Sequence, residues 1–526
     1  MSNLKERYKK AKQAKHIWNS TYQDAAQYAM PERENFYDDS LPGESKTGAG
    51  RIYDSTAQVA FSKFVSNLQS SMIPTGKQWA ELTAGGELEG NIDFRKALQQ
   101  VSEIFFNKMN DSNFDTAAAE AFHDLGLGTG AIMVHKGQKG GVGFSVVPLK
   151  DFMIDEGPRG TIGNVYRDYK MPFRNVQETW PDAEIPDEVK SKFQGREDEN
   201  IELVEATQPK KVKVASRVSQ GKEEVDGYLY EVYTKDFKEK LVSRNMRTSP
   251  FIIFRWEVTP GEVYGRGPLL KALPDIRVLN KTKELLLKNA SINVTGAYTV
   301  VDDGTVNIQN LKIQPGSFIP VAANDGSPQG PTIAALPRSG DVNVSQIVLE
   351  DVIRSVNDIL FTDPLGPIDL PVKTATEISL RQQELSKRIG SAFGRLQREF
   401  LNPLVERVLD VLDEQGEIDL GQFRVDGDLI KIKYTSPLAA SEGEEKVMRM
   451  VQFARNIVET FGQQALMMVV NPMEYAKRLS KHGDVDAEIL NGEEEFQQFR
   501  EILTQQLQQQ AQQQEQQPQP QTQQGL

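Results

Sequence analysis

The chain has 526 residues, 38% of them apolar and 26% charged, which excludes a short peptide and a wholly disordered protein. Its 61 Lys and Arg against 74 Asp and Glu give a net charge of -13, which excludes binding of nucleic acid through the overall electric field. The lack of cysteine in the sequence excludes disulfides, thiolate metal sites and cysteine nucleophiles. Because the sequence shows neither a signal peptide nor an apolar run of about 20 residues, we expect a soluble chain that is neither exported nor membrane-spanning.

The chain begins with predicted helices. Apolar side chains at helical spacing predict helices over 1–30, 54–72, 93–109 and 115–125. Basic side chains crowd the start of the first helix: Lys5, Arg7, Lys9, Lys10, Lys12 and Lys15. Such a cluster indicates either a docking surface for an acidic partner or a solvated helix face, and we favour the solvated face.

Residues 131–256 change to the pattern of β-strands. Tyr228, Tyr230 and Val232 alternate with their neighbours at the period of a half-buried strand. Residues 181–224 are polar and are expected to include loops. The pattern predicts an α+β first half, with helices first and an antiparallel sheet after them.

The second half is predicted to contain an α-hairpin that carries a small tip. A helix over 274–293 and a return helix over 344–360 flank short strands and turns between 297 and 340. Two helices that flank a few short strands form such a hairpin, with the strands at its tip.

A long helix is predicted next, over 374–415, after a loop rich in Pro and Gly. Thr374 and Glu377 form a capping box at its start. Because Pro403 cannot donate a hydrogen bond to the carbonyl of Glu399, we expect a kink there.

The C-terminal part is predicted to contain a hairpin, helices and a tail. Asp426 and Gly427 form a two-residue turn signal between two strand patterns. Ser441 and Glu444 form another capping box, which opens a helix. Between 505 and 524, 14 of 20 residues are Gln, so this segment is expected to be disordered.

Several fragments imitate catalytic motifs without their structural context. Residues 126–131 match G-x-G-x-x-A but follow a helix and open a strand, so we interpret them as a helix end with a left-handed glycine. Residues 43–48 have the spacing of a phosphate loop but lack its Lys and its Ser or Thr. His123 beside Asp124 is interpreted as a satisfied helix histidine. We therefore predict no active site, no metal and no cofactor.

Three segments resemble the portal, or head-to-tail connector, proteins of short-tailed double-stranded DNA bacteriophages. The first is 51–83, with the sequence DSTA near its start and Pro74 and Trp79 after the helix. The second, 256–290, contains Tyr264, Gly265, Arg266, Gly267 and Pro268. The third, 374–409, contains Thr374, Thr376, Glu377 and Arg381. The blocks lie in the expected order around an α-hairpin.

The resemblance implies a portal fold, α+β and helix-rich, that assembles as a ring, usually a dodecamer, around a DNA channel. It implies a wing (1–260 and 374–440), a stem (261–298 and 341–361), a clip (299–340), a crown (441–503) and a Gln-rich tail (504–526). It also implies a protein without enzymatic activity that packages and ejects double-stranded DNA at one capsid vertex of the virion. Its implied partners are the terminase large subunit, tail adaptor proteins, and the major capsid and scaffolding proteins. Assembly is expected in the host cytoplasm, without a membrane.

Two groups of residues are candidate DNA contacts. The first is a channel loop, stiffened by three prolines and a glycine: Thr362, Asp363, Pro364, Leu365, Gly366, Pro367, Ile368, Asp369, Leu370, Pro371, Val372 and Lys373. The second is Arg277, Lys281 and Lys288, which share one face of the first stem helix. These three either contact passing phosphates or form a solvated, salt-bridged stem face.

Two rival functions remain open. One is a tail adaptor or another structural head-completion ring protein, which would be expected to lack the long kinked helix. The other is an ancillary packaging enzyme, which the incomplete phosphate loop opposes.

Overall fold

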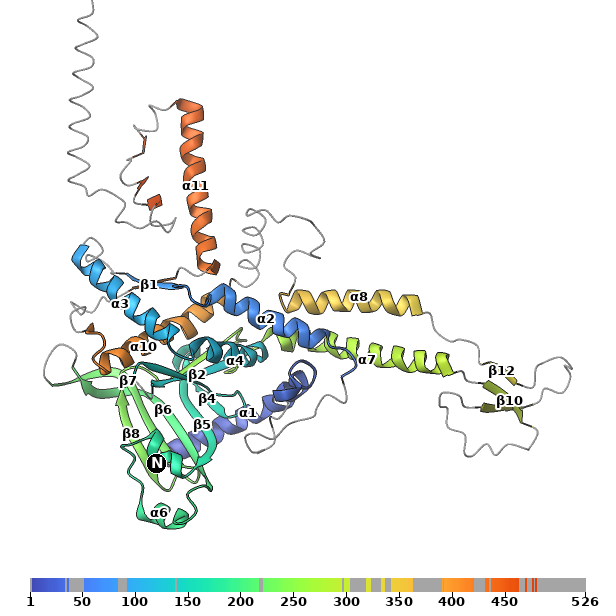
Figure 1. Cartoon of the computed structure of the whole chain (residues 1–526), viewed down its shortest axis with the longest axis horizontal. Helices are drawn as coiled ribbons and strands as arrows, with labels where there is room; N and C mark the ends of the chain where they lie inside the picture. Colours follow the sequence, from blue (N-terminus) through green and yellow to red (C-terminus); the bar gives the residue numbers. More distant parts are fainter. Residues whose placement is uncertain are drawn as a thin grey trace, which may run out of the picture. The chain divides into compact units, whose positions relative to one another are not determined.

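The computed structural model describes these residues: 2–33, 36, 52–83, 92–137, 140–216, 221–295, 298–302, 318–322, 333–335, 342–362, 390, 392–420, 431–434, 437–462, 469–470, 475–476 and 478–479. The chain divides into two compact units, Met1–Pro437 and Leu438–Leu526, which we describe separately (Figure 1). Helices and strands both contribute, which confirms the α+β class. Among the described helices, none has the length and apolar character needed to cross a membrane.

The four helices predicted at the start of the chain are confirmed. They are α1 (Ser2–Ala29), α2 (Thr56–Met72), α3 (Ile92–Asn110) and α4 (Phe114–Leu127), and a short 3-10 helix, η1 (Pro31–Arg33), follows α1. Helix α2 buries one face, which carries Ala57, Ala60, Phe61, Phe64, Val65, Leu68 and Met72. This spacing of three and four residues is the pattern from which the helix was predicted.

Antiparallel strands follow the helices, as predicted, but they form two sheets and not one. The smaller sheet has the order β3-β2-β9 and the larger has the order β4-β5-β6-β7-β8. Their strands are β2 (Thr129–Lys136), β3 (Val142–Val146), β4 (Phe152–Glu156), β5 (Ile162–Pro172), β6 (Asn200–Ala215), β7 (Lys222–Thr234), β8 (Lys240–Met246) and β9 (Phe251–Arg255). The short helices between them are η4 (Pro158–Gly160), α5 (Arg174–Thr179) and α6 (Asp187–Phe193).

Residues 181–224 include loops, as expected, at 181–186 and 194–199. They also contain strand β6, which occupies 16 of these residues and was not predicted. Strand β6 pairs with β7 along their whole common length, from Leu203 opposite Thr234 to Ala215 opposite Lys222. Two polar side chains of β6, Glu205 and Thr207, are buried and hide the alternation on which a strand prediction rests.

Helix α1 packs against the larger sheet. Leu4, Tyr8 and Ala11 of α1 share a buried cluster with side chains of the sheet, among them Tyr166 and Tyr233. The helix therefore presents its apolar stripe to the chain's own strands.

The basic side chains of α1 mostly find partners in the same chain. Arg7 bonds Asp155 at 2.7 Å and Lys12 bonds Asp168 at 2.9 Å. Lys15 is buried and donates to the carbonyl of Phe152 at 2.7 Å. The preferred interpretation as a solvated face therefore holds only for exposed members of the cluster such as Lys9, because much of the cluster docks on the chain's own sheet.

The α-hairpin with a small β tip is confirmed for the described residues. Helices α7 (Pro268–Thr295) and α8 (Val342–Ile359) pack side by side, and Ser355 of α8 donates to Asp275 of α7 at 2.6 Å (Figure 1). Between them lies a sheet of order β11-β10-β12, built from β10 (Tyr298–Asp302), β11 (Phe318–Ala322) and β12 (Ile333–Ala335).

Helix α7 begins six residues before the predicted start at Pro274. Leu269, Ala272 and Leu273 are already buried on its inner side, so the helical pattern extends back to Pro268. Pro274 is exposed inside the helix. Its ring therefore faces solvent and not the packed core.

The irregularity expected near Pro403 is a π-helix, η6 (Gln397–Leu401), which leads into α10 (Asn402–Glu414). The N–H of Asn402 donates to the carbonyl of Gln397, five residues earlier. Since Pro403 has no N–H, one extra residue in the turn accommodates the missing bond. The earlier part of the predicted long helix, up to residue 389, lies outside the described residues.

The strand at the end of this region pairs with a distant segment of the chain, whereas its predicted hairpin partner falls on residues outside those described. Strand β13 (Lys431–Tyr434) pairs antiparallel with β1 (Ala80–Thr83), from Ala80 opposite Tyr434 to Thr83 opposite Lys431. The turn at Asp426 and the strand before it lie outside the described residues. Strand β13 therefore joins a segment some 350 residues away, a long-range pairing that local turn signals do not reveal.

The second unit contains α11 (Pro437–Phe461), which begins four residues before the predicted cap at Ser441. Tyr475 donates to the carbonyl of Met450 on this helix at 3.1 Å. The Gln-rich segment lies outside the described residues.

Candidate functional site

The start of helix α7 is held against the end of α4 by glycine backbones. The carbonyl oxygen of Gly265 lies 2.0 Å from the position of a Cβ built on Gly128, and that of Gly126 lies 2.0 Å from one built on Gly267. The N–H of Gly267 donates to the carbonyl of Leu127 at 3.1 Å. A side chain at any of these contacts would push the two segments apart, which explains glycine in both motifs.

The 126–131 motif is therefore a helix end, as interpreted from the sequence. Helix α4 ends at Leu127, and Gly128 has a φ of +140° before β2 begins. Its carbonyl accepts the N–H of Trp256 at 2.9 Å. The glycines allow close packing and reverse the chain direction. A dinucleotide-binding motif would follow a strand, whereas these glycines follow helix α4, so that interpretation stays rejected.

We call the contact between the glycines of 126–128 and those of 265–267 the glycine anchor. The remaining residues of the Tyr264–Pro268 motif complete it. Tyr264 is buried, and its hydroxyl accepts the N–H of Ile154 at 3.2 Å. Burial raises the pKa of Tyr264, so it stays a neutral phenol. Pro268 is the first residue of α7, where its missing N–H costs no helical bond.

Arg266 of the same motif lies on the surface. It forms a two-pronged bond with Glu262, at 2.8 and 2.6 Å, and its guanidinium lies 5.1 Å from the ring centroid of Trp18. The bond to Arg266 holds the pKa of Glu262 below its usual range. Arg266 thus ties the approach to α7 to helix α1.

The three basic residues proposed for the stem lie along α7 and are paired within the chain. Arg277 bonds Asp24 of α1 at 2.6 Å. Lys281 and Lys288 bond Glu284 from either side, at 2.9 and 2.5 Å. These bonds, with Lys288 contributing most, lower the pKa of Glu284. Within one chain the three residues form a salt-bridged, exposed face, which was one of the two expected arrangements.

Only the first residue of the predicted channel loop is described. The hydroxyl of Thr362 donates to the carbonyl of Asn357 at 3.1 Å. Phe361 has a φ of +54° and accepts the side-chain N–H of Asn67, on α2, at 3.3 Å. Residues 363–373, and Thr374, Thr376, Glu377 and Arg381, lie outside the described residues. The structure therefore fixes the point where the chain leaves α8 toward this segment.

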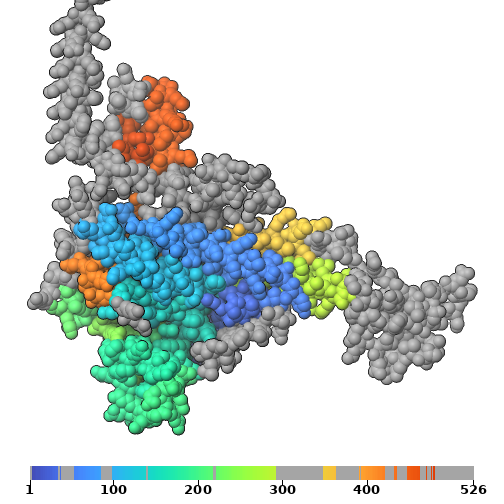
Figure 2. Space-filling model, in the orientation of Figure 1, coloured from blue at the N-terminus to red at the C-terminus, as the bar shows by residue number. Residues whose placement is uncertain are grey.

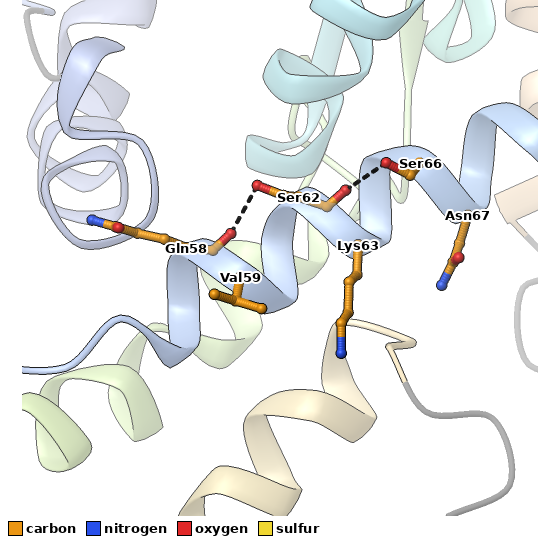
Figure 3. Close-up of a pocket in the computed structure, with 6 residues that line it drawn as sticks. All are labelled: Gln58, Val59, Ser62, Lys63, Ser66 and Asn67. Carbon is orange, nitrogen blue, oxygen red and sulfur yellow. Dashed lines mark hydrogen bonds between the residues drawn. The ribbon is translucent and has the colours of Figure 1, made fainter. Parts of the chain in front are cut away.

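A shallow hollow lies on the outer face of α2 near this point. It is lined by Gln58, Val59, Ser62, Lys63, Ser66 and Asn67 (Figure 3). Ser62 and Ser66 donate to the carbonyls of Gln58 and Ser62, each at 3.0 Å, so their hydroxyl protons are used by their own helix. The lining contains no carboxylate or imidazole. Lys63 is the one titratable side chain in this lining.

His123 and Asp124 do not act on each other as an acid and a base. His123 bonds the carbonyl of Ala119 at 2.8 Å, and burial lowers its pKa. Asp124 bonds Arg33 at 3.1 Å and accepts the N–H of Leu149 at 2.8 Å. The interpretation as a satisfied helix histidine agrees with this geometry. Among the described residues, no cluster of His, Asp and Glu could hold a metal ion.

One buried ion pair was not foreseen from the sequence. Arg255, at the end of β9, bonds Glu399 of η6 at 2.7 Å, and their side chains are 4% and 19% exposed. Arg255 also donates to the carbonyls of Val263 and Gly160, at 3.0 and 3.3 Å. The pair joins the π-helix to the chain that leads into α7. Pro403 signalled the irregular turn, but nothing in the sequence named the partner.

Comparisons with known proteins agree with one another. A profile of the family described as "Bacteriophage head to tail connecting protein" matches residues 1–490. The chain is 21% identical over 468 residues to the probable portal protein of Bordetella phage BPP-1, which covers 86% of this chain and 82% of that protein. It is 20% identical over 441 residues to the portal protein of Salmonella phage epsilon15, and this match covers 81% of this chain and 77% of that protein.

Among solved structures, the chain is similar to one from the neck of an empty GTA particle computed with C6 symmetry. The identity is 12%, the match covers 82% of this chain and 91% of that chain, and the TM-score is 0.34.

Proposed function

Because this chain belongs to the bacteriophage head to tail connecting protein family, we propose that it closes into a ring of twelve copies around a channel for double-stranded DNA. Its function is that of a phage portal protein, and its family is structural. The observation that carries this conclusion is the family match over 1–490 together with curated portal relatives that cover most of the chain.

The regions of the ring follow the order of the elements. Residues 1–260 and 374–440 form the wing, and 261–298 with 341–361 form the stem. Residues 299–340 form the clip and 441–503 the crown. The side-by-side packing of α7 and α8, with a small sheet between them in sequence, supports the assignment of stem and clip.

Residues 362–373 project toward the DNA. Of the two arrangements expected for Arg277, Lys281 and Lys288, their bonds to Asp24 and Glu284 support the salt-bridged stem face over contact with passing phosphates. Residues 362–373 contain a single cation, and the chain has a net charge of -13. Both features suit a channel through which DNA slides, since each fixed contact with a phosphate slows the duplex. The hydrogen bond from the side chain of Asn67 to the carbonyl of Phe361 holds the chain just after α8. This bond supports a loop that starts from a defined point.

The ring acts at the head–tail junction of the virion. The clip docks the terminase large subunit during packaging and tail adaptor proteins afterwards, while the wing contacts the major capsid and scaffolding proteins. Assembly takes place in the host cytoplasm. The protein itself catalyses no reaction and uses no cofactor.

Mass photometry of the purified chain, followed by class averages of negatively stained particles, tests the ring. A closed species near twelve times 58.9 kDa with a central hole is expected. Chains that stay monomeric or dimeric even when scaffolding and capsid proteins are supplied would contradict it.

A further inference from the structure

Helix α7 leaves a regular stripe of side chains exposed, although its other side packs against α1, α4 and α8. The stripe consists of Pro274, Val278, Lys281, Leu285 and Lys288, which recur at intervals of four and three residues. Val278 is 49% exposed and Leu285 is 55% exposed. This interval is the one at which one helix packs its side chains against another.

Helix α8 has a matching stripe. Ile347, Asp351, Arg354 and Asp358 recur at intervals of four, three and four residues and are exposed. Ile347 is 63% exposed, and its neighbour Val348 is 47% exposed. Leu349 and Val356, which are buried, lie on another side of the helix. Figure 2 shows α7 and α8 as neighbouring parts of the described surface.

Scattered single apolar side chains are normal on a protein surface, but these are concentrated. Five large apolar side chains lie exposed on this helix pair: Val278, Leu285, Leu287, Ile347 and Val348. A concentration of this kind marks a surface that another element covers.

The charges of the two stripes have opposite sign. On α7, Lys281 and Lys288 share the single carboxylate of Glu284, which leaves one positive charge in excess. On α8, Asp351 lies 3.9 Å from Arg354, while Glu350 beside them has no ion pair among the described residues. Contact of α7 with a second α7 would bring lysines together, whereas contact of α7 with α8 brings opposite charges together.

We propose that the α7 stripe of one copy packs against the α8 stripe of the next copy. The inference rests on the proposed ring and names the surface that closes it. Because two different surfaces meet, each copy keeps one free α7 stripe and one free α8 stripe, so the contact repeats until the ring closes. Leu285 meets the apolar pair Ile347 and Val348, which in antiparallel packing brings Lys281 level with Glu350 and Asp351.

Charge reversal on the full-length chain tests this contact. The first variant carries Lys281→Glu and Lys288→Glu, the second carries Glu350→Lys and Asp351→Lys, and a third combines all four. A matched control carries Lys190→Glu and Lys192→Glu on α6, which changes the net charge by the same amount as the first variant. Mass photometry measures the ring fraction, and circular dichroism verifies the fold of each variant.

Each single set is expected to reduce the ring fraction roughly tenfold or more, because like charges then face each other across the contact. The combined variant is expected to restore rings, and so is a one-to-one mixture of the first two variants, in which opposite charges meet at every contact. The control is expected to form rings like the wild type.

Three results would overturn the inference. If the first two variants have the same ring fraction as the wild type, the two stripes do not meet. A combined variant that stays unassembled while the mixture assembles would show that each stripe meets its own kind. Loss of rings in the control as well would show an effect of charge alone. A wild-type chain that forms no ring would instead contradict the proposed function.

Discussion

The carbonyl oxygen of Gly265 lies 2.0 Å from the point that a Cβ on Gly128 would occupy. Gly128 follows the last residue of α4, and Gly265 lies three residues before α7, so this contact joins two segments more than 130 residues apart. The N–H of Gly265 also donates to the hydroxyl of Thr129 at 2.9 Å. The close approach fixes where helix α7 begins.

Replacing Gly128 by Ala is therefore expected to lower the free energy of unfolding by about 2–4 kcal/mol, since it adds a steric clash to an unfavourable φ of +140°. Urea unfolding followed by circular dichroism measures the loss. Gly76→Ala is the matched control, because Gly76 has a φ of +71° and no atom within 4 Å of the added Cβ. It should lose only about 1 kcal/mol. Equal losses in the two variants would show that the glycine contact contributes nothing.

Glu399→Ala is expected to destabilise the chain because it leaves Arg255 buried without its carboxylate. Since Glu399 is 19% exposed and Arg255 keeps two carbonyl partners, the free energy of unfolding should fall by about 3 kcal/mol, which is the lower end for buried ion pairs. Glu81→Ala removes the exposed pair with Lys433 and should cost less than about 1 kcal/mol. The same urea titration compares them. A loss from Glu399→Ala no larger than that of the control would contradict a structural role for the pair.

Local patterns in the sequence predict the local parts of this fold. The buried face of α2 follows from the spacing of Phe61, Phe64, Val65 and Leu68. The irregular turn before α10, which is a π-helix, lies where Pro403 predicted a kink, because Pro403 has no N–H to donate. Each of these signals lies within a few residues of the feature it predicts, so no knowledge of the tertiary structure is needed.

Long-range partners could not be predicted in this way. Spacing shows that α1 has a basic start, but not that Lys12 meets Asp168 or that Lys15 enters the core. The pairing of β13 with β1 likewise joins distant segments. Of the candidate site, the glycine anchor has a sequence signal in each half, yet only the structure shows that Gly128 and Gly265 touch.

Lys15 makes the stability of the chain depend on pH. Its ammonium group is buried, and the carbonyl of Phe152 is the acceptor it bonds. Burial lowers its pKa to about 7, although the carboxylates of Asp151, Asp124 and Asp168 act in the opposite direction. In the unfolded chain the group has its ordinary pKa of about 10.5. Between these values the unfolded chain holds a proton that the folded chain lacks, so stability rises with pH from about 7 to about 10.5.

Replacing Lys15 by Met is expected to remove this dependence. The variant should be more stable than the wild type at pH 6.5 by an amount on the order of a few kcal/mol, and the difference should shrink toward pH 10. Urea unfolding at both pH values measures it, and other titrating groups cancel in the difference. Lys9→Met, an exposed change on the same helix, should leave the wild-type dependence intact. Parallel pH profiles for the wild type and Lys15→Met would contradict the assignment.

Lys373 is the only cation of the proposed channel loop, residues 362–373. Because a fixed cation near the duplex replaces mobile counterions, Lys373→Ala is expected to weaken the hold on packaged DNA and reduce the DNA retained per head roughly twofold. Complementation of a phage that lacks its portal gene, with quantitative PCR on purified heads, measures the retained DNA. Lys238→Ala, in the turn between β7 and β8, removes one positive charge elsewhere and should leave retention unchanged. Heads of the Lys373→Ala variant that are as full as those of Lys238→Ala would remove Lys373 from the channel.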